Sequence, residues 1–458
     1  AALKKAGHET RLVIDPCLFD EAGFWRVPAL ARFFSRRDRV LDEAAAFAPD
    51  YIAFSVFTDT LPWALSMAAA ARARTGAKVL FGGIHPSSDP AGTLANPCVD
   101  YVFLGEADQS LPALLARSGG PLPPGVWGKE GGAVVKGPPP APPADLDALP
   151  APDKDLFRSA APVYGSGYLA SASRGCPQAC AYCCNSVYGA LYKGSGVPRL
   201  RRRSPENAAA ELEAAARAGA GFVHFTDEVF NSDYAWLAHF LPLYRAEVGL
   251  PFSCFAFPDA RLAGAAAALA AAGCFKVQLG VQRFDEERRA SLLGRAAANA
   301  DIAAAIKALK AAGIYVVCDN ILDLPDESEA ELAALASFYA GCAPDRNEVF
   351  FLRMYPGTRL AAAYPGAPVP PGGLMRPAGY SPLPPARQRA WASLLTLLPR
   401  LPTFARGYFA ARPGFFAFCG GLPLRALARA LGGQKLDFHT RRFARLYAHF
   451  ILAKITDR

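Results

Sequence analysis

Short apolar runs alternate with helical segments over the first 138 residues of the chain. The runs are TRLVID, YIAFSV, KVLFGG and VDYVFLG, and the segments between them have helical character. This rhythm is typical of a parallel, doubly wound α/β sheet, so we expect one such domain over residues 1–138. The chain opens on AALKKAGHET, which lacks a methionine and has the composition of the second half of a helix. We expect the natural start of the protein to lie upstream.

A proline-rich segment, GPPPAPPADLDALPAPD, occupies residues 137–153. Proline removes a backbone donor and prevents helix formation. We therefore expect a linker over residues 139–165 that lies along a surface of the protein.

The chain between residues 166 and 375 repeats one unit six times, namely a strand, a loop and a helix. The expected strands are GYLASAS, FVHFTD, PFSCFAF, KVQLGV, IYVVCDNIL and EVFFLRMY. Helices are expected to begin at Ser204 and at Pro258-Asp259, and others to end at glycine. The terminating glycines are Gly219, Gly273 and Gly313. Six consecutive units predict a partial (β/α)6, TIM-like barrel with its functional residues on the loops that follow the strands.

Residues 376–458 carry most of the positive charge. They contain fourteen Lys and Arg against two Asp, in a chain whose net charge is +9. Arginines interleaved with aromatic residues and leucines are compatible with peripheral membrane contact, or with closure over a hydrophobic or anionic small-molecule substrate. The favoured interpretation is a small, mainly helical region that packs on the barrel with its basic face in water. We find no nucleic-acid recognition motif and expect no such partner.

Composition sets the remaining limits. The 458 residues are 52% hydrophobic and 19% charged, which is enough for two or three globular domains, and we expect no membrane span. Seven of the eleven cysteines stand singly, mostly in apolar segments. That usage suits a reducing cytoplasm and not a disulfide scaffold.

The other four cysteines lie together in SASRGCPQACAYCCNS, as Cys176, Cys180, Cys183 and Cys184. A structural zinc site needs four ligands, and the adjacent Cys184 cannot easily turn toward the metal that Cys183 binds. Buried core thiols are a poor alternative, because the segment is rich in loop-forming Pro, Gly, Gln and Asn. An iron–sulfur cluster held by three thiolates explains the odd number and leaves one iron open for chemistry.

The spacing C-x3-C-x2-C, with Tyr182 before its last cysteine and on the loop after the first barrel strand, resembles the radical S-adenosylmethionine (radical SAM) superfamily. The resemblance implies that Cys176, Cys180 and Cys183 bind three irons of a 4Fe-4S cluster. It also implies that the fourth iron chelates SAM and that Tyr182 packs near the adenine. Cys184 has no role in the pattern.

Later strand ends carry weaker parts of the same resemblance. Asp227 and Glu228, in FTDEVF, could accept hydrogen bonds from the SAM ammonium, with a helix N-cap as the alternative. Gln282 stands where the family favours Glu, and its amide could bond a ribose hydroxyl. DNILDLPDESE resembles the turn after the fifth strand, although Asp323 stands where glycine is common. MYPGTRL matches the Pro-Gly-Thr that closes the barrel in one subgroup, with a simple tight turn as the alternative.

The first block resembles the Rossmann-like cobalamin-binding domain that precedes the barrel in cobalamin-dependent radical SAM enzymes. Three expected strand ends would let the backbone approach a large flat ligand. They carry Ser55, Gly82, Gly83, Gly105 and Glu106. The loop that supplies an axial histidine to cobalt in many such domains would precede Ala1. We expect His85 to be a hydrogen-bonded loop residue, and His8 and His224 to be structural.

The resemblance implies an enzyme that uses a 4Fe-4S cluster, SAM and cobalamin to functionalise an unactivated carbon of a small molecule. It further implies a reducing partner such as flavodoxin or ferredoxin, and a cytoplasmic location. Methyl transfer is the favoured reaction, because a cobalamin domain fused to the barrel is suited to carry a methyl group. A cyclase or rearrangement catalyst, a cobalamin-binding sensor without turnover, and a zinc-bound structural protein are the alternatives.

Overall fold

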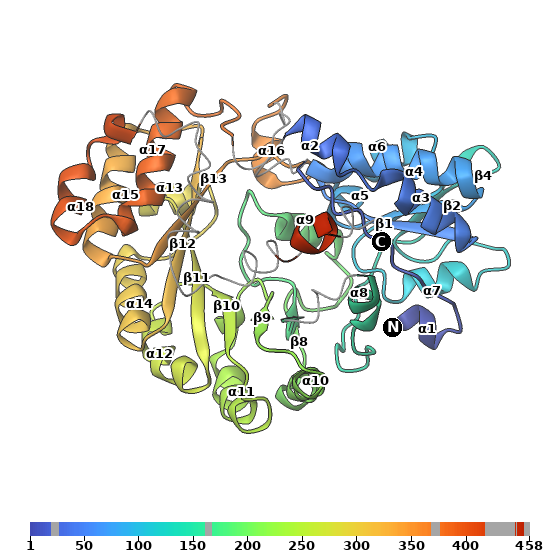
Figure 1. The fold of residues 1–458 in the computed structure, drawn as a ribbon, viewed down its shortest axis with the longest axis horizontal. Coiled ribbons are helices and arrows are strands. Elements are labelled where there is room, and N and C mark those ends of the chain that lie inside the picture. Colours follow the sequence, from blue (N-terminus) through green and yellow to red (C-terminus); the bar gives the residue numbers. More distant parts are fainter. Residues whose placement is uncertain (20–26, 161–166, 368–375, 417–444, 446, 453–458) are drawn as a thin grey trace.

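The computed structural model describes residues 1–19, 27–160, 167–367, 376–416, 445 and 447–452. The chain forms two lobes, an N-terminal α/β lobe and a larger lobe built on a curved parallel sheet (Figure 1). The segment LPLRALARALGG of the basic tail lies outside the described residues. In the part of the chain that is described, no helix combines the length and apolarity needed to cross a bilayer.

The N-terminal sheet is Rossmann-like on one side and antiparallel on the other. Its strand order is β1-β2-β3-β4-β5, with the first three strands parallel and the last two antiparallel. The strands are β1 (Tyr51–Ser55), β2 (Lys78–Gly82), β3 (Tyr101–Phe103), β4 (Val126–Glu130) and β5 (Ala133–Lys136). The α/β class is therefore confirmed, and the β4–β5 hairpin adds an antiparallel edge that the sequence pattern did not reveal.

The strand predicted for TRLVID is wrong. Residues 10–15 form no ladder, and β1 is the outer strand of the described sheet. The apolar side chains of this run are used differently, since Val13 packs beside Val40 and Met67 on the helices that cover the sheet. These covering helices are α1 (Ala2–Lys5), α2 (Pro28–Phe33), α3 (Arg37–Ala46), α4 (Leu61–Thr75), α5 (Ile84–Ser88), α6 (Pro90–Ala95) and α7 (Ser110–Leu115).

The second lobe is the expected partial barrel. Six parallel strands lie in chain order, β6-β9-β10-β11-β12-β13, with helices along their outer face (Figure 1). The strands are β6 (Tyr168–Ala170), β9 (Val223–Phe225), β10 (Phe252–Ala256), β11 (Cys274–Gln282), β12 (Tyr315–Leu322) and β13 (Arg346–Phe351). A small antiparallel pair, β7 (Ser173–Arg174) with β8 (Arg201–Arg202), flanks the first strand. Each predicted barrel strand is confirmed, although the first two are shorter than their apolar runs.

Helices of the barrel begin and end largely where the sequence predicts. Ser204 caps α10 by accepting a hydrogen bond from the Asn207 amide at 3.2 Å. Asp259 accepts from the Leu262 amide at 3.1 Å, but α12 begins at Leu262, three residues after the predicted Asp259. The helices of this lobe are α9 (Cys184–Leu191), α10 (Pro205–Arg217), α11 (Tyr234–Glu247), α12 (Leu262–Ala271), α13 (Glu286–Ser291), α14 (Asn299–Ala311), α15 (Glu329–Cys342) and α16 (Arg359–Ala363).

The proline-rich segment and residues 376–416 of the tail pack on the barrel lobe, whereas Tyr447 and Phe450 pack on Leu18 and Phe19 of the N-terminal lobe. The carbonyl of Pro143 accepts from Arg201 at 2.7 Å, and Lys154 donates to the Leu169 carbonyl on β6 at 3.0 Å. At the opposite edge, Asn347 on β13 donates to the Leu395 carbonyl at 3.0 Å. The elements involved are α8 (Asp155–Ala160), α17 (Pro385–Leu397) and α18 (Thr403–Phe409). Buried Trp391 and Leu394 of α17 join the main core.

The barrel strands divide their side chains between two environments, as the period of two requires. On β12, Val316, Cys318 and Leu322 join the core formed with the outer helices. The alternate residues face the inside of the barrel. That inner face is polar, whereas a closed (β/α)8 barrel fills its interior with branched apolar side chains.

Candidate functional site

The four clustered cysteines occupy the loop between β7 and α9. Cys176 and Cys180 are buried, while Cys183 and Cys184 are half-buried at the start of α9. Burial raises the pKa of Cys176 to about 11, and the neighbouring charges of Cys180 and Cys183 raise it further. The three thiols therefore lie close enough to influence one another across a single loop.

Cys183 differs from Cys176 because its thiolate is stabilised. The Cys184 thiol donates to its sulfur, and together with the Asn185 groups this bond lowers the pKa of Cys183 to about 7 despite burial. The Asn185 side-chain nitrogen lies 3.7 Å from the Cys183 sulfur. This gives Cys184, which had no expected role, a place as a hydrogen-bond donor to its neighbour.

Thiolates are the usual ligands of an iron–sulfur cluster, and Cys176, Cys180 and Cys183 lie on this one loop. Among the residues that the structure describes, no three His, Cys, Asp or Glu side chains are arranged to hold one metal ion. A cation also approaches the loop, since the Arg295 guanidinium lies 3.8 Å from the Cys180 sulfur and donates to the Gly280 carbonyl at 2.7 Å. The sequence analysis missed Arg295, which lies 115 residues from Cys180.

Tyr182 lies at the mouth of the barrel. Its ring packs with Ala181, Leu293, Ile321 and Met354, which come from four different loops and strands. Burial raises the pKa of its hydroxyl well above the ordinary value. The aromatic residue between the last two cysteines thus contributes to an apolar floor beside them.

Asp227 and Glu228 are neighbours with opposite orientations. Asp227 is 1% exposed, and it accepts from the Ala172 amide at 3.0 Å and from the Ser173 hydroxyl. It therefore fixes the segment that leads into the cysteine loop. Glu228 instead lines a cavity, and desolvation raises the pKa of its carboxyl.

Two non-glycine residues at strand ends adopt the left-handed conformation. Gln282, at the end of β11, has φ +72°, and Asp323, after β12, has φ +67°. Such a backbone is costly for a residue with a Cβ atom and needs support from its surroundings. The Asp323 carboxylate accepts from the Gly379 and Ser381 amides at 3.0 and 2.9 Å. These bonds account for an aspartate where the family favours glycine.

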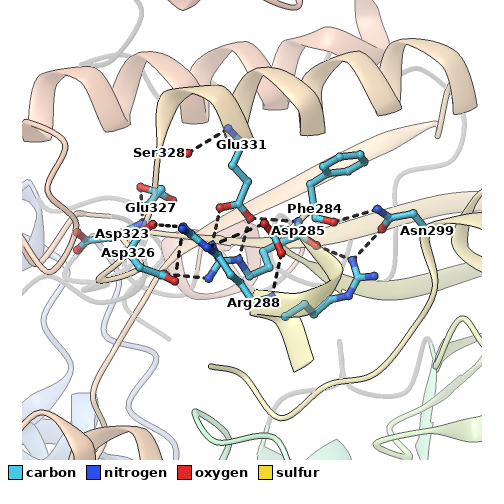
Figure 2. A network of polar contacts seen from close by, with 11 residues as sticks. Phe284, Asp285, Arg288, Asn299, Asp323, Asp326, Glu327, Ser328 and Glu331 are labelled. Atoms are coloured by element: carbon cyan, nitrogen blue, oxygen red, sulfur yellow. Dashed lines mark hydrogen bonds and ion pairs between the residues drawn. The ribbon is translucent and has the colours of Figure 1, made fainter. Parts of the chain in front are cut away.

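The loops after β11 and β12 are joined by a network of charged side chains (Figure 2). Arg283, whose side chain is 2% exposed, donates to Asp326 at 2.9 Å and to Glu331 at 2.7 Å. Arg288 donates to the Asp326 carbonyl at 2.8 Å. Arg283, the residue after Gln282, is thus buried and paired with carboxylates that follow β12, close in the chain to Asp323.

The residues expected to approach cobalamin lie at the strand ends of the N-terminal lobe, as predicted, but their surroundings differ from one residue to the next. Ser55 is exposed, and a Cβ atom on Gly82 would meet its nearest neighbour at 3.8 Å. Gly83 has φ +101°, and a Cβ atom there would lie 2.9 Å from the Val56 backbone. The backbone conformation of this turn therefore requires glycine at position 83, whether or not a ligand binds nearby.

Gly105 and Glu106 contact the barrel lobe. A Cβ atom on Gly105 would lie 2.1 Å from the Tyr192 hydroxyl oxygen, which accepts from the Glu106 amide at 2.7 Å. The Glu106 carboxylate accepts from Arg174 at 2.7 Å and also from Arg201. These two arginines, which the sequence analysis missed, connect the β3 end to the residues next to the cysteine loop.

His85 makes the expected hydrogen bond, but it lies in the short helix α5 and not in a loop. The Nδ1 atom of His85 lies 3.1 Å from the Thr58 hydroxyl, and burial lowers the pKa of the imidazole. His224 is buried, with its Nδ1 2.7 Å from the Ser253 hydroxyl. His8 lies after α1, outside both strand-end regions.

A cavity of about 480 Å³ lies where the two lobes meet. Its lining comes from both lobes and from the cysteine loop, and includes Glu106, Arg174, Cys176, Tyr188, Thr226 and Glu228. This volume is within the range of small-molecule sites. A group bound here would contact the first cysteine, the first two barrel strands and the N-terminal lobe together.

Comparisons with known proteins agree with this geometry. Residues 171–339 match the Radical SAM superfamily and residues 1–115 match the B12 binding domain. The chain is 26% identical over 328 residues to the uncharacterized methyltransferase PH0819 of Pyrococcus horikoshii, covering 69% of each chain.

Solved structures share the fold at low identity. TsrM from Kitasatospora setae, a radical SAM methyltransferase solved with tryptophan and a SAM analogue, is 19% identical. The match covers 72% of this chain and 68% of TsrM, with a TM-score of 0.58. OxsB, a cobalamin-dependent SAM radical enzyme solved with aqua-cobalamin and SAM, is 16% identical. Here the coverage is 68% of this chain and 46% of OxsB, with a TM-score of 0.56.

Proposed function

We propose that this protein transfers a methyl group to an unactivated carbon of a small molecule. The proposal rests on its family, because the chain joins a B12-binding domain to a radical SAM domain and so belongs to the cobalamin-dependent radical SAM enzymes. When bound, the 4Fe-4S cluster, SAM and cobalamin supply radical generation and a carrier for the methyl group. The protein binds these groups, orients them and excludes water.

The cysteine loop is the proposed cluster site. Cys176, Cys180 and Cys183 hold the irons, while Arg295 and Asn185 donate toward the sulfurs of Cys180 and Cys183. Donors of this kind stabilise thiolates in a partly buried site. Asp227 acts indirectly, because its hydrogen bonds to Ala172 and Ser173 fix the segment that leads into the cysteine loop.

We assign SAM to the barrel mouth. Tyr182 supplies an apolar surface for the adenine, Glu228 accepts from the ammonium, and the Gln282 amide bonds the ribose. The proximity of Glu228 to Cys176 along one cavity supports this arrangement. The left-handed backbone of Gln282 supports it too, because strained residues held by their surroundings occur most often at functional sites.

For cobalamin we keep Ser55 and Gly82 as the residues of closest approach. Gly83, Gly105 and Glu106 act by shaping the strand-end turns and by holding the two lobes together. The observation that carries the proposed function is the cavity at the lobe junction, which brings the B12-binding domain to the first cysteine.

Electrons would come from a reducing protein such as flavodoxin or ferredoxin. We place the reaction in the cytoplasm, on the support of buried single cysteines such as Cys254 and Cys318, which are free thiols in apolar surroundings. Methyl transfer is favoured over cyclisation because TsrM and PH0819 are both described as methyltransferases.

The test is turnover by the anaerobically reconstituted protein with SAM carrying a deuterated methyl group. Tryptophan, the ligand of TsrM, and a panel of small aromatic amines and alcohols serve as substrates. We expect a labelled product together with S-adenosylhomocysteine and 5′-deoxyadenosine. An unlabelled product formed with 5′-deoxyadenosine alone would identify a cyclase or rearrangement catalyst instead.

A further inference from the structure

The inner face of the barrel is open to solvent at its middle. Phe255, Gln278 and Asp319 are partly exposed although each belongs to a central strand, whereas Ser171 and Thr226, which follow β6 and β9, are exposed to the cavity at the lobe junction. Their strand neighbours on the outer face are buried in the main core. The described strands therefore surround a space that water enters, lined by alternate side chains of the sheet.

Most charges on this inner face are buried and compensated. Lys276, Arg346 and Glu348 are 2%, 7% and 3% exposed, and Arg346 pairs with Glu348 at 3.1 Å. Asp319 is the one charged residue of the six described barrel strands that faces inward and remains accessible. A ligand inside the barrel would meet this carboxyl and no other charge from the strands.

Asp319 is oriented by its neighbour on β11. The Gln278 side-chain nitrogen donates to both carboxyl oxygens, at 2.8 and 2.9 Å. Desolvation inside the barrel and the nearby Glu348 together raise the pKa of Asp319 to about 7, although the Gln278 bond and the charges of Arg346 and Lys276 act to lower it. An approaching cation would favour the ionised carboxylate and would be bound by it.

Apolar side chains flank this polar pair. Phe255 pairs in register with Gln278, and Phe350 on β13 pairs with Ile321, two residues along β12 from Asp319; both phenylalanines are partly exposed. Leu169, on the first strand, is also partly exposed on the inner face. The combination of one accessible carboxyl with aromatic and aliphatic walls fits a ligand with an apolar body and one cationic or hydrogen-donating group.

We propose that Asp319, held by Gln278, is the specificity-determining residue of the substrate site, and that the substrate is a small amine with an apolar, aromatic-sized body. This inference rests on the proposed function, because it takes the inside of the barrel as the place where the substrate is bound. It extends that function by naming the class of molecule and the residue that selects it.

The test is equilibrium dialysis of the anaerobically reconstituted protein against three probes of matched size. Phenethylamine carries an ammonium group, 2-phenylethanol a hydroxyl, and 3-phenylpropionate a carboxylate. We expect phenethylamine to bind most tightly and 3-phenylpropionate least. Phenethylamine should bind more tightly as the pH rises from 6 to 8, because ionisation of Asp319 is then complete.

The variant Asp319→Asn keeps the shape of the side chain and should weaken phenethylamine binding about tenfold while removing its pH dependence. Gln278→Leu frees the carboxyl from its donor and should weaken the same binding by a smaller factor. Asp301→Asn, on α14, is the matched control and should bind like the parent. Thermal unfolding of each variant checks that the fold is kept.

Equal binding of the three probes by the parent, or unchanged phenethylamine binding by a folded Asp319→Asn protein, would overturn this inference. Methyl transfer to a substrate without an amine would also overturn it while leaving the proposed function intact. Conversely, selective amine binding with no methyl transfer to any substrate would remove the proposed reaction and keep the assignment of Asp319.

Discussion

The two lobes use the polar residues at their strand ends in opposite ways. In the barrel lobe, Asp227 and Asp323 turn inward and accept backbone amides of their own lobe. In the N-terminal lobe, Glu106 turns outward and pairs with Arg174 and Arg201 of the other lobe. A carboxylate at the end of a parallel strand is therefore a candidate ligand only after its hydrogen bonds have been counted. By that measure Glu228, which lines the cavity, stays available, whereas the other three do not.

The largest effect is expected from Asp227→Ala. The change leaves the Ala172 amide and the Ser173 hydroxyl without their buried acceptor, which should cost about 3 kcal/mol in the free energy of unfolding. Urea denaturation measures that cost, and iron content after reconstitution measures the effect on the cysteine loop.

Glu228→Ala is its matched control, because that neighbouring side chain is exposed. It should leave the free energy of unfolding within about 0.5 kcal/mol of the parent. Equal losses of stability in the two variants would show that the buried Asp227 carboxylate stabilises the fold no more than the exposed Glu228 carboxylate does.

Glu106→Gln tests the other side of the comparison. The Arg201 side chain is 4% exposed and would lose its charged partner, so we expect a loss of about 2 kcal/mol. Because this pair spans the lobes, calorimetry should show the single unfolding transition splitting into two.

Asp108→Asn removes a more exposed partner of Arg174 and should cost less than about 1 kcal/mol, without separating the lobes. A single transition of unchanged midpoint in Glu106→Gln would show that the ion pairs do not hold the lobes together.

The last comparison is between the adjacent glycines Gly82 and Gly83 at the end of β2, and it separates an effect on the fold from an effect on ligand binding. Gly83→Ala forces a Cβ atom against the Val56 backbone at positive φ and should cost about 1 to 2 kcal/mol. Gly82→Ala makes only an ordinary contact, so its stability should stay within about 0.5 kcal/mol of the parent.

Cobalamin binding, followed by absorbance, should nevertheless weaken in Gly82→Ala if the ligand approaches that backbone. Unchanged cobalamin affinity in this variant would remove Gly82 from the proposed site.

Much of the fold could be predicted from the sequence because the signals are local. The apolar runs of the barrel correspond to strands, and Ser204 caps its helix as predicted. TRLVID fails for a non-local reason, since a strand needs a paired neighbour and the described sheet ends at β1. The apolar run alone could not show whether that neighbour exists.

The candidate site was predicted less completely, for the same physical reason. The cysteine loop is contiguous, so its spacing alone favoured a cluster. Arg174 and Glu106 are 68 residues apart in the chain, and Arg295 and Cys180 are 115 apart. No periodicity relates such pairs. The sequence showed that Asp323 stands where the family favours glycine. It could not show why, because the three backbone amides that bind the Asp323 carboxylate belong to a segment beyond the barrel.

The open arrangement of the six barrel strands also bears on aggregation. A closed barrel has no outer strands, whereas here β6 and β13 end the sheet and could pair with another chain. Lys154 bonds a carbonyl of β6, and α17 packs against β13, so the segment before the barrel and the helix after it each cover one edge. A protein shortened to end at residue 375 would expose β13 and should self-associate, even though all six strands and the cysteine loop are retained.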